Sequence, residues 1–529
     1  MAVITPQTEI RLVKCPLELS DLNQLTFSNA TAQYTYFNGL SHVTTDNATY
    51  QRKDGYIRYP AKFDDIVHYN YVMYQNEAYS NKWFYAYIDK MEYISDGMTA
   101  IYIKTDCFQT WQFDLTYKRT FVEREHTNDD TVGANTVPEG LEKGEYVTNG
   151  TISEQVLAKC VGREYRIVMG ISDMDLLVPN MPSGFNNVPE YGGVPSGLTY
   201  VVAESTTAMI NIVNLYDTNS KADAIYTIFL TPKTLIPDVE IGWSAGSTDR
   251  IGFLASSTYP RTVGTFTLSR PTTINGYTPV NKKLLVYPYN YCYITNNTGT
   301  DIDFHYEDFT GGVVSFTTKG VFNSGCSIKA VPDNYKGQTT YYNAGIMGPK
   351  LPVCGWNSDS YTNWLTQNSM NIGLQNVANL GKLAMLPFGG VGASLSALSI
   401  FESVTSVEAE KYQASLMPDQ AKGNTNSSDI NYASEKCAFS LVPMSIKAEY
   451  ARIIDDYFSM YGYKTNRVKV PNVTGRTNWN FVKTIGCYIA GDIPQEDMAT
   501  IKEMFDAGVT FWHNPLTFMD YSQSNSIVV

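Results

Sequence analysis

The sequence has few histidines and lacks the motifs of the common enzyme classes. Its five histidines lie far apart, with no His-x-Glu, His-Glu-x-x-His or paired-histidine spacing that would hold a catalytic metal. It has no Gly-x-Ser-x-Gly elbow, no phosphate-binding glycine loop and no dinucleotide-binding fingerprint. We therefore predict a protein that is not an enzyme and that needs neither a metal nor a cofactor.

Adjacent carboxylates occur at Asp129–Asp130 and at Asp455–Asp456. Nothing in the sequence predicts that the pKa values within either pair would diverge, as a division into acid and base roles requires. We interpret both pairs as solvated surface residues. Asp492, which precedes Pro494 by two residues, is expected to cap the last helix rather than to act in catalysis.

Clustered cysteines and a secretory leader are also missing. The eight cysteines are scattered, and no two lie closer than Cys326 and Cys354. This spacing fits neither a zinc site nor a small-domain disulfide pattern, so we expect buried free thiols in a chain folded in a reducing cytoplasm. Met1–Pro6 lacks the basic and apolar regions of a signal peptide. We therefore expect synthesis in the cytoplasm, with any exposure outside the cell coming by another route.

Positive charge is in deficit, because 52 Asp and Glu outnumber 39 Lys and Arg and give a net charge of −13. Such a surface does not attract phosphate backbones through counterion release, which disfavours a DNA-wrapping role. An acidic wall nevertheless suits a conduit through which DNA slides without sticking, because like charges create no local traps.

Aromatic residues are abundant, at 13% of the chain with 39 tyrosines, and they favour pleated, half-buried surfaces. We predict a fold that is mainly β with minor α. At 529 residues the chain exceeds one core and is expected to form several domains. The runs Trp83–Ile88 and Met98–Thr105 flank Asp96–Gly97, which predicts a two-residue hairpin with positive φ at both turn positions. Phe108–Phe113 is expected to continue the sheet.

The middle of the chain is expected to be β-rich as well. A polar connector at Thr127–Gly144 precedes it. Many short strand-like runs follow between Glu145 and Lys350, separated by turns rich in Gly, Pro and Asn, which predicts barrels or sandwiches. Examples of these runs are Ile225–Leu230, Thr265–Leu268 and Lys283–Tyr287.

Two helices are expected in the last hundred residues. The first, Ile446–Tyr461, has aromatic and apolar side chains at helical spacing and stops at Gly462. The second begins at Pro494, ends at Gly508 and precedes a strand at Val509–His513. The residues at helical spacing in the first helix are Tyr450, Ile453, Ile454, Tyr457, Phe458 and Tyr461, and the expected buried stripe of the second is Met498, Ile501 and Phe505.

The segment Leu383–Phe401 carries no charge. Its length approaches the roughly 20 apolar residues that span a bilayer as a helix, but Pro387 and three nearby glycines would break that helix. We expect a mobile apolar loop that is hidden in one state and meets lipid in another. A buried core helix or an ordinary subunit contact is the alternative. The candidate membrane-active residues are Leu383, Ala384, Met385, Leu386, Pro387, Phe388, Gly389, Gly390, Val391, Gly392, Leu395, Leu398, Ile400 and Phe401.

The flanks of this loop differ from it in composition. Thr405–Gln420 is expected to form an amphipathic helix that ends near Pro418. The polar run Lys422–Asp429 is expected to mark the far base of the loop. Across about 358–430, the chain is thus expected to leave a β framework and return to it.

Phrases near both ends of the chain occur in an order that resembles the tail-knob, or distal tail tube, proteins of small φ29-like podophages of Gram-positive bacteria. The first block comprises Met73–Asn76, Asn81–Tyr87, Gln109–Asp114 and Phe121–His126. The second comprises Lys447–Arg452, Tyr461–Lys469, Pro471–Asn472, Cys487–Ile493 and Phe505–His513. Together these phrases cover about a third of the chain.

The resemblance implies a homo-hexameric tube at the tip of a short tail, with β-barrel-like modules in its wall. It implies a conduit for genome ejection, whose apolar loops plug the tube and then enter the host membrane as a pore. The expected partners are other tail proteins, membrane lipids and, non-specifically, the DNA that passes through. On this basis we predict an N-terminal tube-wall block at 1–130, β-rich outer domains at 131–357, the loop excursion at 358–430 and a C-terminal α/β block at 431–529 that completes the tube.

Two other functions remain open at this point. A receptor-binding or wall-polysaccharide-binding tail protein would use the many aromatic side chains for stacking on sugar rings. A tail-borne wall hydrolase has less support, because no acid–base pair stands out in the sequence.

Overall fold

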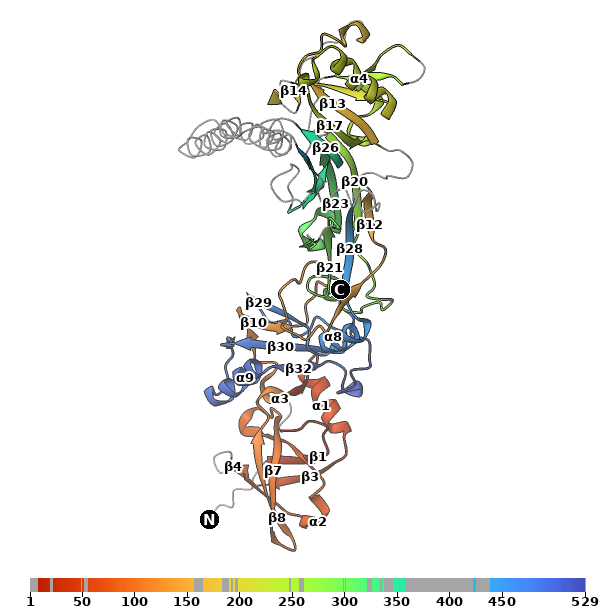
Figure 1. Ribbon diagram of the computed structural model, residues 1–529. Helices are drawn as coiled ribbons and strands as arrows, with labels where there is room; N and C mark the ends of the chain where they lie inside the picture. Colours follow the sequence, from red (N-terminus) through yellow and green to blue (C-terminus); the bar gives the residue numbers. More distant parts are fainter. Residues whose placement is uncertain are drawn as a thin grey trace, which may run out of the picture. The chain divides into compact units, whose positions relative to one another are not determined.

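The structure is a computed structural model in which the chain divides into two compact units, each assembled from separate stretches of sequence (Figure 1). Unit 1 comprises Met1–Gly144, Tyr277–Leu284 and Ala448–Val529. Unit 2 comprises Glu145–Gly276 and Leu285–Lys447. The structure describes residues 8–19, 22–48, 50–51, 56–156, 165–182, 190–191, 194–195, 198–246, 249–255, 261–297, 299, 301–320, 326–333, 335–336, 346–351, 353–357, 422–424 and 438–528.

The predicted domain ranges relate to these units in different ways. Residues 1–130 fall within unit 1, whereas 431–529 is shared between the units, with the division after Lys447. The short stretch Tyr277–Leu284 belongs to unit 1, although both flanks belong to unit 2. The four predicted ranges, including their roles in a tube, remain predictions.

The first sheet of unit 1 has seven strands in the order β3-β1-β6-β7-β8-β5-β4, and all of its neighbouring strands are antiparallel. Its buried side chains, such as Ile10, Val72 and Ile101, form one core cluster. The strands are β1 (Thr8–Val13), β3 (His42–Ala48), β4 (Tyr50–Gln51), β5 (Tyr56–Tyr59), β6 (Tyr71–Asn76), β7 (Phe84–Ser95) and β8 (Met98–Thr105).

The predicted hairpin is confirmed, but its turn differs from the expectation. Ser95 of β7 pairs with Met98 of β8, so the loop is the two residues Asp96–Gly97. Neither residue has a φ in the left-handed region. The register shifts between Tyr93 and Ser95, directly beside the turn. Such an irregularity adds local twist, so the strands can close without the positive φ values of a type I′ turn.

The second sheet of unit 1 has five strands in the order β2-β32-β30-β10-β29, so β29 is an edge strand. β2 and β32 are parallel, and the other pairs are antiparallel. The strands are β2 (Asn23–Leu25), β10 (Thr120–Glu125), β29 (Tyr463–Lys469), β30 (Trp479–Ile485) and β32 (Val509–Trp512), and a separate pair is formed by β9 (Thr116–Tyr117) and β31 (Ile489–Ala490).

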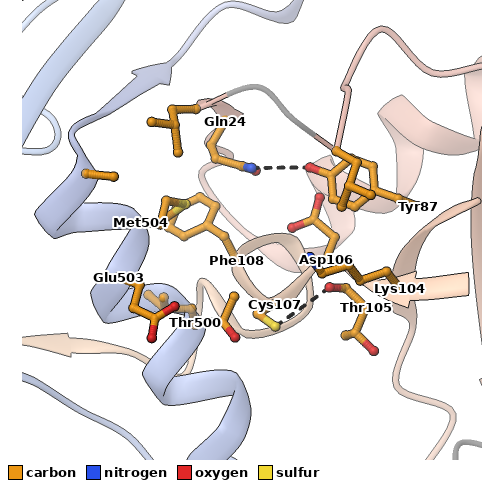
Figure 2. A pocket seen from close by; sticks show the side chains of 14 residues that line it. Gln24, Tyr87, Lys104, Thr105, Asp106, Cys107, Phe108, Thr500, Glu503 and Met504 are labelled. Atoms are coloured by element: carbon orange, nitrogen blue, oxygen red, sulfur yellow. Dashed lines mark hydrogen bonds between the residues drawn. The ribbon is translucent and has the colours of Figure 1, made fainter. Parts of the chain in front are cut away.

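The helices of unit 1 are α1 (Ala30–Gly39), α2 (Phe63–Ile66), α3 (Cys107–Trp111), α8 (Ala448–Tyr461) and α9 (Gln495–Ala507). The expectation that Phe108–Phe113 continues the sheet is wrong, because α3 covers most of it. Asp106 caps this helix by accepting a hydrogen bond from the backbone N–H of Gln109 at 3.0 Å. Figure 2 shows Phe108 of α3 facing Met504 of α9.

The two C-terminal helices are confirmed, with corrections to their details. Gly462 ends α8 with a φ of +64° and donates its backbone N–H to Phe458 O at 2.8 Å. Of the residues at helical spacing in α8, Ile454 and Phe458 are buried, whereas Ile453 and Tyr461 are exposed. Asp492 does not cap α9, because the residue at the cap position is Pro494, which makes no side-chain capping hydrogen bond. Ile501 and Phe505 are buried as expected, and β32 follows Gly508.

Unit 2 contains three larger sheets. A seven-stranded sheet has the order β18-β19-β16-β13-β17-β26-β27, a second has the order β11-β28-β21-β22 with β12 also on β28, and a third has the order β20-β23-β24-β25. The predicted strands at 225–230 and 265–268 are confirmed within β17 and β20. The strands are β11 (Tyr146–Thr148), β12 (Ser153–Val156), β13 (Tyr165–Ile171), β14 (Glu190–Tyr191), β15 (Val194–Pro195), β16 (Thr199–Ala203), β17 (Ile225–Pro232), β18 (Ile241–Trp243), β19 (Ile251–Leu254), β20 (Arg261–Ser269), β21 (Asn290–Thr295), β22 (Asp301–Phe304), β23 (Val313–Gly320), β24 (Cys326–Asp333), β25 (Ile346–Leu351), β26 (Val353–Asn357), β27 (Lys422–Asn424) and β28 (Ala438–Ile446).

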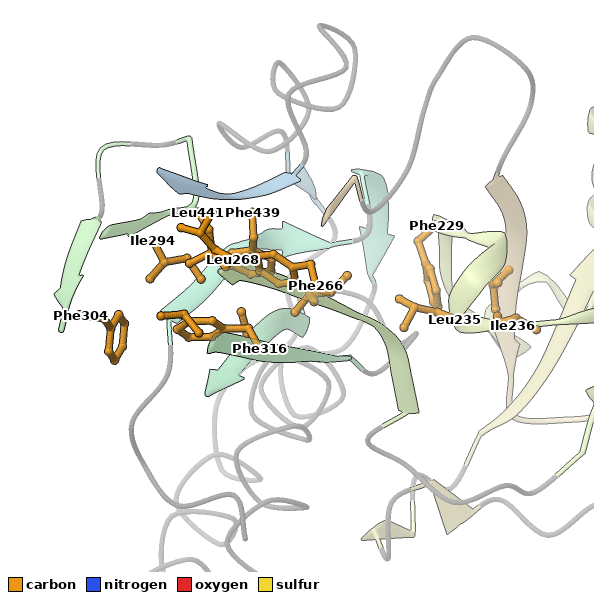
Figure 3. Close-up of a cluster of buried hydrophobic side chains, with 14 of the residues drawn as sticks. Phe229, Leu235, Ile236, Phe266, Leu268, Ile294, Phe304, Phe316, Phe439 and Leu441 are labelled. Carbon is orange, nitrogen blue, oxygen red and sulfur yellow. The ribbon is translucent and has the colours of Figure 1, made fainter. Parts of the chain in front are cut away.

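One apolar core extends through the three larger sheets of unit 2 (Figure 3). Phe229 comes from the seven-stranded sheet, Phe266 and Phe316 from the four-stranded sheet, and Phe304 and Phe439 from the five-stranded sheet. All five side chains are buried, and Phe316 lies at 5.1 Å from Phe304 between ring centroids. The fold class predicted from the sequence, mainly β with minor α, is confirmed.

Helices are few in unit 2 and 3-10 turns connect many of the strands. The α-helix described there is α4 (Thr206–Thr218), whose N-cap Ser205 accepts a hydrogen bond from Ala208 N at 3.1 Å. The predicted strand at 283–287 is wrong, because a 3-10 turn occupies Lys282–Leu285. Among the described residues, the 3-10 turns are η1 (Glu77–Tyr79), η2 (Val178–Asn180), η3 (Ala222–Ala224), η4 (Lys233–Leu235), η5 (Asp238–Glu240), η6 (Lys282–Leu285), η7 (Tyr306–Asp308), η8 (Thr310–Gly312) and η9 (Pro515–Thr517).

Candidate functional site

The candidate membrane-active residues between Leu383 and Phe401, and the helix expected at Thr405–Gln420, lie outside the described residues. The residues directly before 358 and directly after 421, which flank both segments, are described. β26 runs up to Asn357 and β27 begins at Lys422, and the two strands pair antiparallel with Asn357 opposite Lys422. The pairing places the two ends side by side at the edge of the seven-stranded sheet.

A buried carboxylate on α8 holds the stretch Tyr277–Leu284 within unit 1. Asp455 is 1% exposed. It accepts hydrogen bonds from the Tyr277 hydroxyl at 2.7 Å and from the Val280 backbone N–H at 2.7 Å. It also accepts from Asn281, through the backbone N–H at 2.9 Å and the side-chain amide at 2.8 Å. The interpretation of Asp455 as a solvated surface residue is therefore wrong.

A second carboxylate, Asp130, contacts the same stretch. It accepts hydrogen bonds from the Tyr463 hydroxyl and from the Lys282 backbone N–H, the latter at 3.2 Å. Burial raises the pKa of Asp130 above its usual value, and the Tyr463 hydrogen bond opposes that shift. Its neighbour Asp129 is exposed, so the surface interpretation holds for only one member of this pair.

The third carboxylate, Glu139, lies in the polar connector and its side chain is 0% exposed. It pairs with Lys283 and with Arg124 of β10, and it accepts a hydrogen bond from the Lys464 backbone N–H at 2.9 Å. Burial lowers the pKa of Lys283, while the charge of Glu139 opposes that change. One carboxylate thus joins the connector, the stretch Tyr277–Leu284 and two strands of the five-stranded sheet.

The histidines in this sheet are structural. His126 accepts a hydrogen bond from Phe481 N at Nδ1, 2.8 Å away, so its Nε2 carries the proton that is donated to Ser459 O at 3.1 Å. Burial lowers the pKa of His126 to about 3, and Arg476 adds to the shift. Burial also lowers the pKa of His513 to about 4. Both rings are neutral near pH 7.

The described thiols are also unreactive. Cys15, Cys107, Cys292 and Cys487 are free and buried, as the cysteine spacing predicted for the chain, and the other four cysteine side chains are not described. Burial raises the pKa of Cys15 and of Cys107 to about 12 and that of Cys487 to about 11. A thiol is nucleophilic only as its thiolate, so these groups are packed side chains at neutral pH.

A cavity of about 290 Å³ lies in unit 1 between α3 and α9 (Figure 2). Asp106 at its wall accepts hydrogen bonds from the Tyr71 hydroxyl and the Gln109 backbone N–H, each at 3.0 Å. Burial raises the pKa of Asp106. Gln24 donates to the Tyr87 hydroxyl at 3.3 Å across the same wall. The hydrogen bonds of Gln24 and Asp106 thus connect parts of unit 1 and cap α3, which indicates a structural role for these residues.

Neither a metal cluster nor a membrane-spanning helix is found in the part of the chain that the structure describes. No three His, Cys, Asp or Glu residues there gather in a way that would hold a metal ion. No helix among the described residues combines the length and apolar character needed to cross a bilayer.

The sequence analysis missed the roles of Asp130, Glu139 and Asp455 as hydrogen-bond acceptors between distant parts of the chain. A signal was present for Asp455, because Ala451, Asp455 and Phe458 share one face of α8 at spacings of four and three residues. A carboxylate on an apolar helix face predicts a buried partner. No comparable pattern marks Glu139, because its partners come from distant parts of the chain.

The phrases that carried the resemblance lie almost entirely in unit 1, where they supply β6, β10, β29, β32 and α8. Residues 257–526, just over half of the chain, match the family model described as "Bacillus phage phi29, Tail knob protein gp9, C-terminal domain". Residues 6–116 match the family model "Caudoviral major tail protein N-terminus".

Similar proteins cover nearly the whole chain. The tail knob protein gp9 of Bacillus phage B103 is 25% identical over 95% of both chains, and that of Bacillus phage phi29 is 25% identical over 98% of both. The solved structure of the bacteriophage C1 tail knob protein gp12 has a TM-score of 0.58 at 13% identity, and the match covers 98% of this chain and 100% of that chain. That likeness shows a shared fold.

The β-rich fold and these similarities define a structural protein of a short-tailed phage, carried in the tail of the virion. The chain belongs to the phi29 gp9 tail knob family. Membership in this family confirms the resemblance seen in the sequence, and it implies assembly with other tail components.

Proposed function

We propose that the protein forms a hexameric distal tail tube that conducts the genome during ejection. In this proposal, the apolar stretch Leu383–Phe401 plugs the tube before infection and then enters the host membrane as a pore. Membership in the tail knob family supports the tube, and the net charge of −13 supports a lumen through which DNA passes without binding.

The observation that carries the pore proposal is the pairing of β26 with β27. Asn357 and Lys422 lie opposite each other, so the two residues that flank 358–421 are held side by side at the edge of the sheet. Such an attachment lets the long intervening segment change position without disturbing the sheet, because β26 and β27 stay paired with each other. The sheet itself is anchored in the buried core of unit 2 through β13, β16 and β17.

The driving force is a change in where apolar surface is buried. Inside the tube, copies of Leu383–Phe401 would shield one another from water, at about 25 cal/mol for each Å² of apolar surface removed. DNA under pressure would displace them, and lipid would then provide equivalent burial. The glycines and Pro387 disfavour a continuous helix, so the segment can change conformation between the two sites.

The test is dye release from liposomes by the purified protein. The comparison variant has Leu383–Phe401 replaced by a short Gly/Ser linker, which leaves β26 and β27 intact. Equal assembly mass for both proteins is the control for folding. Release by the intact chain alone supports a pore formed by this segment. Equal release by both proteins, or none by either, contradicts it, and the protein would then be a conduit alone.

A second candidate function, binding of wall polysaccharide, is favoured by one aromatic cluster in unit 2. Tyr287 is 41% exposed and stacks on His305, with 3.8 Å between ring centroids. Tyr291 lies 6.2 Å from Tyr287 and 5.2 Å from Tyr146. Exposed aromatic faces of this kind stack on sugar rings.

The measurement that separates this function from the pore is sedimentation of the protein with purified cell walls. The variant Tyr287→Ala should weaken sedimentation if the cluster binds glycan. Tyr93→Ala is the matched control, because Tyr93 is an exposed tyrosine of unit 1. Equal sedimentation of all three proteins would exclude a glycan site at Tyr287.

A further inference from the structure

An exposed apolar row crosses three adjacent strands of the five-stranded sheet in unit 1. Val468 of β29 pairs with Phe121 of β10, and Phe121 pairs on its other side with Ile485 of β30. Residues that pair directly in antiparallel strands point to the same face, so these three side chains lie next to one another. Val468 is 59% exposed and Ile485 is 57% exposed.

The opposite face of the same strands is buried, which makes the exposed row unusual. Val122 and Thr484, which follow and precede the row along their strands, are 0% exposed. Val470, which follows β29 directly, and Tyr488, three residues after β30, are also exposed. Contiguous apolar surface of this kind on a soluble protein marks a contact site.

The row ends at an unpaired strand edge. β29 is the last strand of its sheet in the described part of the chain, so no further strand there pairs with its outer side, and one of its N–H groups, that of Lys464, donates to Glu139 instead. Natural proteins protect such edges or use them for association. An edge strand flanked by exposed apolar side chains is therefore suited to contact another protein chain.

The charged side chains near the row indicate which kind of protein chain would bind there. Lys118 and Arg119, just before β10, are exposed, and no carboxylate among the described residues forms an ion pair with them. In contrast, Lys483 pairs with Glu123 at 3.0 Å, and Lys469 pairs with Glu125. The row is thus bordered by unpaired positive charge on a chain whose net charge is −13. A second copy of the chain, being acidic, complements this border.

We infer that the row Val468–Phe121–Ile485, together with the β29 edge, is the surface through which one copy of the chain contacts the next copy. The inference rests on the proposed hexameric tube and assigns a contact surface to it. A contact between this surface and a different surface of the neighbour is heterologous, and such contacts form a ring when the rotation from copy to copy closes. Burial of the row would remove its apolar side chains from water in every copy.

The test uses the full-length chain with Val468→Asp and Ile485→Asp together, with mass measured by light scattering over a range of concentrations. Both side chains are exposed, so the thermal unfolding midpoint should not change. A second double variant, Val468→Ser with Ile485→Ser, introduces no charge and is measured in the same way in case the Asp variant misfolds. Ile94→Asp is the matched control, because Ile94 is an exposed isoleucine on β7 of the other sheet.

The expected result is assembly of the intact chain and of Ile94→Asp, and a fall of at least about tenfold in the apparent association constant for each substitution in the row. If the row variants assemble as the intact chain does, the inference is wrong while the ring stands. If the intact chain stays monomeric at all concentrations, the proposed hexamer itself fails, and the inference fails with it. If Arg119→Gln abolishes duplex DNA binding and the row variants still assemble, this face contacts DNA instead.

Discussion

Asp455 of α8 accepts two hydrogen bonds from Asn281, one from its backbone N–H at 2.9 Å and one from its side-chain amide at 2.8 Å. Asn281 belongs to the short stretch through which the chain returns to unit 1 between two passages through unit 2. The Asn281 amide also donates to Ser459, one turn further along α8, at 2.7 Å. The returning stretch is therefore held by the buried Asp455 carboxylate together with Asp130 and Glu139.

Replacement of Asp455 by Ala should destabilise unit 1 strongly. The donors of Tyr277, Val280 and Asn281 would lose their charged acceptor inside the protein, which costs about 3–5 kcal/mol in unfolding free energy. Urea unfolding followed by tryptophan fluorescence measures this loss. Asp456→Ala is the matched control, because Asp456 is exposed, and it should change the free energy by less than about 0.5 kcal/mol. Equal effects of the two substitutions would contradict the role assigned to Asp455.

Two glycines with nearly the same backbone conformation should respond differently to alanine. Gly462 has a φ of +64° and Gly486 a φ of +66°. A Cβ at Gly462 would lie 2.2 Å from Glu125 O, whereas no atom lies within 4 Å of a Cβ at Gly486. We expect Gly486→Ala to cost about 1 kcal/mol of unfolding free energy from its positive φ. Gly462→Ala should cost at least about 2 kcal/mol more, because backbone must move. Similar unfolding midpoints for the two variants would refute this.

His126 should make the stability of unit 1 depend on pH in the acidic range. Burial lowers its pKa from 6.5 to about 3, so the unfolded chain binds one more proton than the folded chain between these values. Stability therefore rises with pH across this window and is lost as pH falls below 6.5. One proton corresponds to a slope of up to about 1.4 kcal/mol per pH unit.

The measurement is the unfolding free energy of the intact chain and of His126→Gln between pH 4 and pH 7, and the difference between the two curves isolates His126. His513, whose pKa burial lowers to about 4, contributes in the same direction to both proteins. Asp130 and Asp106 act in the opposite direction just above pH 3.8, because burial raises the pKa of each. An unchanged slope in His126→Gln would show that His126 is not buried and neutral.

Local patterns in the sequence predicted several elements correctly, because the signals for them are local. Gly462 and Gly508 end α8 and α9, as expected from glycine at positions of positive φ. The hairpin of β7 and β8 followed from alternation around Asp96–Gly97. The error at α3 was also local, since Asp106 followed three residues later by Gln109 is a helix-capping pattern that the aromatic composition of the segment concealed.

Long-range partners could not be predicted in this way. Glu139 contacts Lys283 and Lys464, and the sequence separations are 144 and 325 residues. The exposed row has the same origin, because Phe121 meets Val468 and Ile485 only through the register of three distant strands. The local sequence around Val468 predicts only an ordinary strand residue. For the candidate membrane-active segment, composition remains the basis of the prediction.

The most direct test of the proposed pore is a fluorescent label placed inside the segment. The chain would carry one reactive cysteine at Leu395, with Cys160, Cys326, Cys354 and Cys437 replaced by serine. The remaining thiols are buried, and burial raises the pKa of Cys15 and of Cys107 to about 12, so the label should go to position 395. A label at Asn424 of β27, at the base of the segment, is the matched control.

The measurement is quenching of each label by brominated lipids when the assembled protein is mixed with liposomes. The account predicts strong quenching and a blue shift of emission at position 395, in parallel with dye release, and neither effect at position 424. Dye release without quenching at position 395 would contradict the account, because another part of the protein would then open the membrane. An absence of both would show that the segment does not enter lipid.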